Sequence, residues 1–132
     1  MTKITKGSCN CGAVTWEVRG EMRPILACHC SQCRKQSGLY FAATAADDDT
    51  LTISGDTLKW YWASPETMPE AKRGFCSHCG CSLFWKNEKE TFTSILAGSI
   101  DGDTGLEIAQ HIFVDDKPDW YEITDGKPIR AQ

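Results

Sequence analysis

Much of the chain alternates between apolar and polar positions with the two-residue period of a β-strand. Residues 13–19 place Val14, Trp16 and Val18 on one face, a pattern typical of a half-buried strand. The run 39–46 is apolar enough for a strand that is buried on both faces. The same criteria predict further strands at 24–27, 51–53, 58–63, 82–86, 91–97 and 108–114.

Helix is scarce in this pattern. Residues 31–37 are compatible with one or two helical turns, and Gly38 then supplies the stop signal. The segment 64–70 contains two prolines and is predicted to be a loop. The acidic run 47–49 lacks the spacing and the downstream glutamate of an EF-hand, so we interpret it as a solvated turn. Because strands dominate, we expect one mainly β domain over residues 1–132.

Composition and charge argue against several classes of partner. The chain has 14 Lys and Arg against 18 Asp and Glu, a net charge of −4, and its basic residues cluster no further than adjacent pairs. A nucleic-acid interface or an anionic membrane surface requires a clustered basic face, so neither is an expected partner. No stretch approaches the roughly 18 apolar residues of a membrane span. Residues 1–7 lack the apolar core of a secretory signal, and a cytoplasmic location is therefore expected.

Cysteine is the exception in an otherwise ordinary composition, with eight residues in 132. In a reducing compartment, clustered cysteines indicate metal or redox chemistry more often than disulfides. Closely spaced pairs such as Cys9 and Cys11 are also poorly placed to bridge each other. The densest cluster is Cys28, Cys30 and Cys33, which puts three thiols within six positions. Three protein ligands are what a catalytic zinc keeps when its fourth position is open.

A second cluster has the pattern of a zinc knuckle, Cys76-Ser77-His78-Cys79-Gly80. One knuckle supplies two ligands, and a tetrahedral structural site needs four. The missing pair comes either from Cys9 and Cys11, in the turn predicted at 7–12, or from two of the central three cysteines. Spacing favours the first choice, which leaves the central three as a set.

Three other side chains compete for roles near the thiols. Cys81 is most simply a small buried side chain, and the alternatives are a fourth ligand that closes the central site or a redox partner. His78 is expected to point away from its knuckle into solvent. His111 is more simply a satisfied core or edge histidine than a pocket residue.

Taken together, these motifs make the chain resemble the glutathione-dependent formaldehyde-activating enzyme (GFA) family. The segments that carry the resemblance are GSCNCG at 7–12, CHCSQCR at 28–34 with Ser37-Gly38, FCSHCG at 75–80, and HIFVD at 111–115 before Trp120. The resemblance implies a β-tent of two antiparallel sheets organised around zinc-binding cysteine loops. It also implies two zinc ions per chain, a structural one on Cys9, Cys11, Cys76 and Cys79 and a catalytic one on Cys28, Cys30 and Cys33.

The activity that the resemblance implies is that of a zinc-dependent carbon–sulfur lyase similar to S-(hydroxymethyl)glutathione synthase. Such an enzyme joins glutathione or a similar thiol to formaldehyde or another small aldehyde, here as a monomer or homodimer. The two carboxylates of glutathione require cations, and the nearest in sequence to the thiols are Arg34, Lys35, Lys72 and Arg73, of which Arg34 and Lys35 are preferred. The alternative function is a non-enzymatic zinc-binding module for protein interaction.

Overall fold

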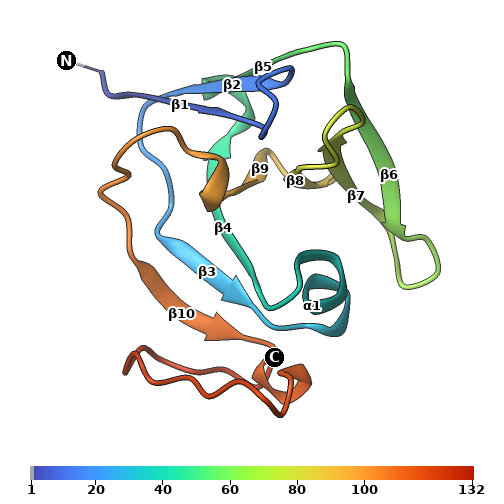
Figure 1. The fold of residues 1–132 in the computed structure, drawn as a ribbon, viewed down its shortest axis with the longest axis vertical. Coiled ribbons are helices and arrows are strands. Elements are labelled where there is room, and N and C mark those ends of the chain that lie inside the picture. Colours follow the sequence, from blue (N-terminus) through green and yellow to red (C-terminus); the bar gives the residue numbers. More distant parts are fainter. Residues whose placement is uncertain (1) are drawn as a thin grey trace.

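The computed structural model describes residues 2–132; Met1, the first residue of the segment 1–7 considered above, lies outside the described residues. Two sheets form the fold (Figure 1). The smaller has the strand order β1-β2-β5, with β1 at Ile4–Ser8, β2 at Thr15–Arg19 and β5 at Leu51–Ser54. In the view of Figure 1 it lies at one end of the molecule, and the helix α1 lies towards the other end.

The larger sheet has seven strands in the order β10-β3-β4-β9-β8-β7-β6. Their bounds are Ile25–Cys28 (β3), Phe41–Asp47 (β4), Leu58–Ser64 (β6), Met68–Cys76 (β7), Ser82–Asn87 (β8), Phe92–Leu96 (β9) and Ile108–Ile112 (β10). This arrangement confirms the expected mainly β fold with two sheets. One detail differs, because β10 pairs with β3 in parallel, whereas the other strand pairs are antiparallel.

The main core lies where the inward faces of the two sheets meet. The alternation in β2 buries Trp16 and Val18, as the pattern of residues 13–19 predicts, and they pack with Leu83, Phe84 and Ile95 of the larger sheet. The indole N–H of Trp16 donates a hydrogen bond of 3.0 Å to the hydroxyl of Ser99, so its one polar atom is satisfied in the core.

The predicted helix is present as α1, Ser31–Ser37. The Cys30 sulfur accepts a hydrogen bond of 3.3 Å from the N–H of Cys33, which caps the first turn with a thiol. Gly38 ends the helix in the left-handed conformation at φ 92°, and its N–H bonds to the Arg34 carbonyl. Cys33 is the one buried residue of this helix, so the helix packs against the rest of the protein mainly through this side chain. Among the described residues, no helix is both long enough and apolar enough to cross a membrane.

The prediction of a loop over 64–70 is partly wrong, because β7 already begins at Met68. The two prolines suggested an interruption, but Pro69 falls outside the paired register of β7 with either neighbour. A proline there removes no ladder hydrogen bond. The turn predicted at 7–12 also begins later, since Gly7 and Ser8 belong to β1.

We expect Gly7→Ala to lower the free energy of unfolding by about 1–3 kcal/mol, the usual cost of overpacking a core. A Cβ at position 7 would lie 2.2 Å from the Trp16 ring, and both residues are held by strand pairing. Urea denaturation measures the loss. The control is Gly98→Ala, where an added Cβ meets no atom within 4 Å. Equal stability losses in the two variants would contradict the packing argument.

Candidate functional site

Four thiols from two distant segments meet between the sheets. Cys9 and Cys11 come from the turn after β1, and Cys76 and Cys79 come from the end of β7 and the turn that follows. Their sulfurs all lie within 4.8 Å of one another, with 3.6 Å between Cys9 and Cys11 and 3.8 Å between Cys11 and Cys76. Sulfurs bound at about 2.3 Å to one tetrahedral zinc are about 3.8 Å apart. The donor set therefore fits a zinc ion.

Hydrogen-bond donors lower the pKa of two thiols of this group, Cys9 and Cys76, whereas the contacts of Cys11 with the other thiols raise its pKa to about 12. The Thr57 hydroxyl lies 3.3 Å from the Cys76 sulfur, and the N–H of Val14 donates to Cys9 at 3.3 Å. The pKa of Cys76 falls to about 6, chiefly because of the Thr57 hydroxyl and, against the effect of burial, because of the N–H groups of Cys79 and His78. These are the donors that a metal-binding thiolate requires around it.

The second group consists of Cys28, Cys30 and Cys33, whose sulfurs also lie within 4.8 Å of one another. Cys28 ends β3, Cys30 caps α1 and Cys33 is in its first turn. Hydrogen bonds from Cys28 and Cys33 lower the pKa of Cys30 to about 2, and hydrogen bonds with Cys30 and Cys33 raise the pKa of Cys28. Three sulfurs gathered this closely, one of them favoured as a thiolate, form a donor set that suits a cation.

Arg73 is the charged residue that joins this group. Its side chain comes from β7 and is only 2% exposed. Nη2 donates to the Cys33 sulfur at 3.3 Å, Nε donates to Gln32 Oε1 at 3.1 Å, and the guanidinium lies 5.1 Å from the centre of the Phe41 ring. Nη1 is buried and has no hydrogen-bond partner. Hydrogen bonds from Nε and Nη2 therefore fix the guanidinium in place, and Nη1 is the nitrogen left without an acceptor.

A cavity of about 480 Å³ opens beside the three-thiol group and is lined by all three cysteines and by Arg73. Its other walls come mainly from the larger sheet and are mostly apolar, with large side chains from Leu26, Phe41, Trp85, Phe92, Ile112 and Phe113. A site of this size, with few polar groups converging on one side, is typical of small-molecule binding.

The cations preferred from the sequence lie elsewhere. Arg34 donates to the carbonyl of Asp116 at 3.3 Å, Lys35 is exposed, and neither lines the cavity. Lys72 pairs with Glu88 and lies over the Trp60 ring at 4.7 Å. The role of Arg34 and Lys35 in binding a co-substrate stays a prediction. Arg73 was one candidate among four, and its burial follows once 68–76 is recognised as a strand that turns Ala71 and Arg73 inward.

A hydrogen-bonded pair of buried histidines links the central thiol loop, through His29, to β10, through His111. His29 and His111 are both 0% exposed, and His29 Nε2 lies 2.8 Å from His111 Nδ1. His111 Nε2 lies 2.8 Å from a carboxylate oxygen of Asp125. A carboxylate only accepts, so the neutral tautomer of His111 that fits this contact carries its hydrogen on Nε2, and Nδ1 then accepts a hydrogen bond from His29 Nε2–H. Burial is the main cause that lowers the pKa of His29, which keeps it neutral in this chain of bonds.

His111 is thus a satisfied core histidine, and His78 is exposed, as expected for both. Cys81 is partly buried against the core, and its sulfur donates to the Ser82 carbonyl at 3.5 Å. Among the described residues it belongs to neither thiol group, so it does not close the central one.

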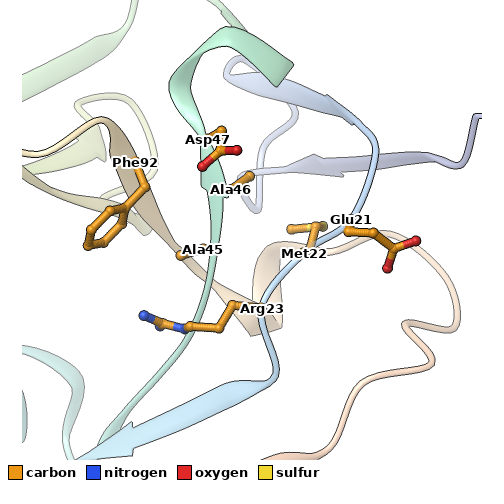
Figure 2. Close-up of a pocket in the computed structure, with 7 residues that line it drawn as sticks. All are labelled: Glu21, Met22, Arg23, Ala45, Ala46, Asp47 and Phe92. Carbon is orange, nitrogen blue, oxygen red and sulfur yellow. The ribbon is translucent and has the colours of Figure 1, made fainter.

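A second depression, of about 370 Å³, contains no thiol. Figure 2 shows that its lining comes from the segment before β3, from β4 and from the start of β9. Arg23 and Phe92 contribute to both spaces. The larger cavity is the candidate site because the three-thiol group lies on its wall.

Comparisons with known proteins show the family to which this chain belongs. A family model described as glutathione-dependent formaldehyde-activating enzyme matches residues 4–116. A curated protein of Halomonas elongata, named "Putative glutathione-dependent formaldehyde-activating enzyme", is 33% identical over 139 residues, which cover 97% of this chain and 86% of that protein. A crystal structure of a Rhodobacter sphaeroides protein is similar with a TM-score of 0.61 and 26% identity, over 76% of this chain and 91% of that one.

We expect Cys79→Ser to reduce the metal content by one ion per chain and to lower the melting temperature, because it removes one of four gathered sulfurs. Native mass spectrometry and thermal unfolding provide the two measurements. Cys81→Ser is the matched control two positions away, and it should keep its full metal content. Loss of metal in both variants would show that Cys81 is a ligand.

Replacing His111 with phenylalanine should lower the free energy of unfolding by about 1–3 kcal/mol, because the buried His29 Nε2 then has no acceptor. His78→Phe, at an exposed position, should change it by less than about 0.5 kcal/mol. Chemical denaturation of the two variants side by side tests this. If His111→Phe is as stable as the wild type, the histidine pair does not brace the thiol loop.

Proposed function

Because the chain belongs to the glutathione-dependent formaldehyde-activating enzyme family, we propose that it is a zinc-dependent carbon–sulfur lyase that joins a thiol to an aldehyde. The observation that carries the proposal is the group of three thiols on the wall of a cavity. Three ligands leave one position of a tetrahedral zinc open to a substrate, whereas the four-thiol group would leave none.

The two thiol groups then have different roles. Cys9, Cys11, Cys76 and Cys79 would hold a structural zinc that joins the two sheets. Cys28, Cys30 and Cys33 would hold the catalytic zinc. Zinc bound there would lower the pKa of an incoming thiol and polarise an aldehyde oxygen.

Arg73 would adjust the charge of the central site. Zinc with three thiolates has a net charge of −1, which opposes an incoming thiolate. The guanidinium, 3.3 Å from the Cys33 sulfur, offsets that charge in a buried setting where Coulomb interactions are strong. Gln32 holds the Arg73 Nε and so keeps the guanidinium in position.

The thiol that the family description indicates is glutathione. We propose that its sulfur reaches the central group while its carboxylates stay outside the apolar cavity. Arg34 and Lys35 are the cations proposed for them, since both lie on the helix that carries Cys33. The sulfur attacks the carbonyl carbon, a carbon–sulfur bond forms, and the carbonyl oxygen takes up a proton to give the S-hydroxyalkyl adduct.

Zinc counting with and without glutathione tests this function. We expect the wild type to bind two zinc ions and one glutathione in native mass spectrometry. Cys33→Ser should stay folded and keep one zinc, because its four-thiol group is intact. It should bind glutathione at least tenfold more weakly, because the three-thiol group has lost one sulfur. If glutathione never adds to the wild type and Cys33→Ser unfolds, both metals are structural, and a non-enzymatic zinc module for protein interaction replaces the enzyme.

A further inference from the structure

The cavity is far larger than formaldehyde requires. Its volume is about 480 Å³, within the range of sites that hold ligands of many heavy atoms. Formaldehyde has only two heavy atoms, and a water molecule, with one, occupies about 30 Å³. Most of the space must therefore accommodate something other than the reacting carbonyl group.

The walls do not suit the body of glutathione. Glutathione carries two carboxylates and an ammonium group, and burying such charges without partners is costly. Among the described residues that line the cavity none is acidic, and the basic ones are Arg23 and Arg73. Arg23 already donates from Nη2 to the Ala43 carbonyl at 3.0 Å and from Nε to the Pro24 carbonyl at 3.3 Å. The aromatic and aliphatic walls instead match an uncharged apolar group.

Arg73 offers one oxygen-binding position in these apolar surroundings. Nε and Nη2 are held by Gln32 and Cys33, and Nη1 is buried without a partner. A buried donor without an acceptor is unfavourable until a ligand supplies one. A carbonyl oxygen of a ligand beside the three thiols would satisfy it once the side chains that cover Nη1 move aside.

Phe113 marks the mouth of the cavity. It lines the cavity, yet it remains 39% exposed, so its ring lies between the interior and solvent. Among the described residues it is the one non-glycine residue with positive φ, at φ 55° and ψ 40°. Backbone strain of this kind collects at functional sites, and here it fixes an aromatic ring at the entrance.

We propose that the cavity holds the apolar substituent of an aryl aldehyde whose carbonyl oxygen accepts a hydrogen bond from Arg73 Nη1. This inference rests on the proposed thiol–aldehyde function and names its aldehyde class. The sulfur bonds to the carbonyl carbon while the carbonyl π electrons move to the oxygen. The oxygen then takes up one proton, and the thiol has lost one, so the number of protons is unchanged. The addition therefore needs neither oxidant nor reductant.

Benzamide and formamide test the cavity without any reaction, because both present a carbonyl oxygen but neither adds a thiol. Titration calorimetry on the zinc-loaded protein should give at least tenfold tighter binding for benzamide. Phe113→Ala should weaken benzamide binding at least threefold, and Trp120→Ala, a 69% exposed aromatic residue that does not line the cavity, should leave it unchanged. Arg73→Lys should weaken both ligands, with its zinc content checked by native mass spectrometry.

Equal affinity for the two amides, or benzamide binding that is indifferent to Phe113→Ala, would overturn the proposal. The reaction itself is read separately by NMR detection of the adducts that glutathione forms with benzaldehyde and with formaldehyde. A kcat/KM at least tenfold higher for benzaldehyde supports the aryl class, and a preference for formaldehyde overturns it. If neither aldehyde reacts although benzamide binds at Phe113, the proposed function fails and the assignment of an aldehyde fails with it.

Discussion

The strongest constraint on the fold is that thiols from distant segments must lie close together. Cys11 and Cys76 are 65 residues apart in sequence, yet their sulfurs are 3.8 Å apart. They join the turn that follows β1 in the small sheet to the end of β7 in the large one. Donors such as the Thr57 hydroxyl stabilise ionised sulfur, and a metal ion bound between four thiolates would offset their mutual repulsion. The packing of the two sheets and the affinity for that metal would then be coupled.

The central thiols are stabilised by other means. Arg73 places a permanent positive charge against Cys33, and the pair of His29 and His111 supports the loop from behind. The side that faces the cavity is left to apolar walls. The three-thiol group therefore lies on the wall of a cavity, whereas the four-thiol group, whose Cys11 is exposed at the surface, does not line that cavity. A ligand in the cavity could therefore reach the three-thiol group without disturbing the four-thiol group.

Local pattern was sufficient to predict the elements whose causes are local. The alternation around Trp16 and the stop at Gly38 follow from sequence alone, and both are present. The start of β7 was missed because Pro69 usually interrupts a sheet, and only the register shows that its missing N–H is harmless. The burial of Arg73 and the link between His29 and His111 depend on contacts between distant segments, which no local window of sequence contains.

The histidine brace has a consequence for the order in which the molecule assembles. His29 lies within the central thiol loop, near the start of the chain, but its partner His111 follows 82 residues later. On the ribosome, the loop that carries Cys28, Cys30 and Cys33 emerges long before the strand that fixes its rear face. For most of translation these three thiols are present without their scaffold, so the cell's thiol reductants and metal carriers meet them before the finished fold does.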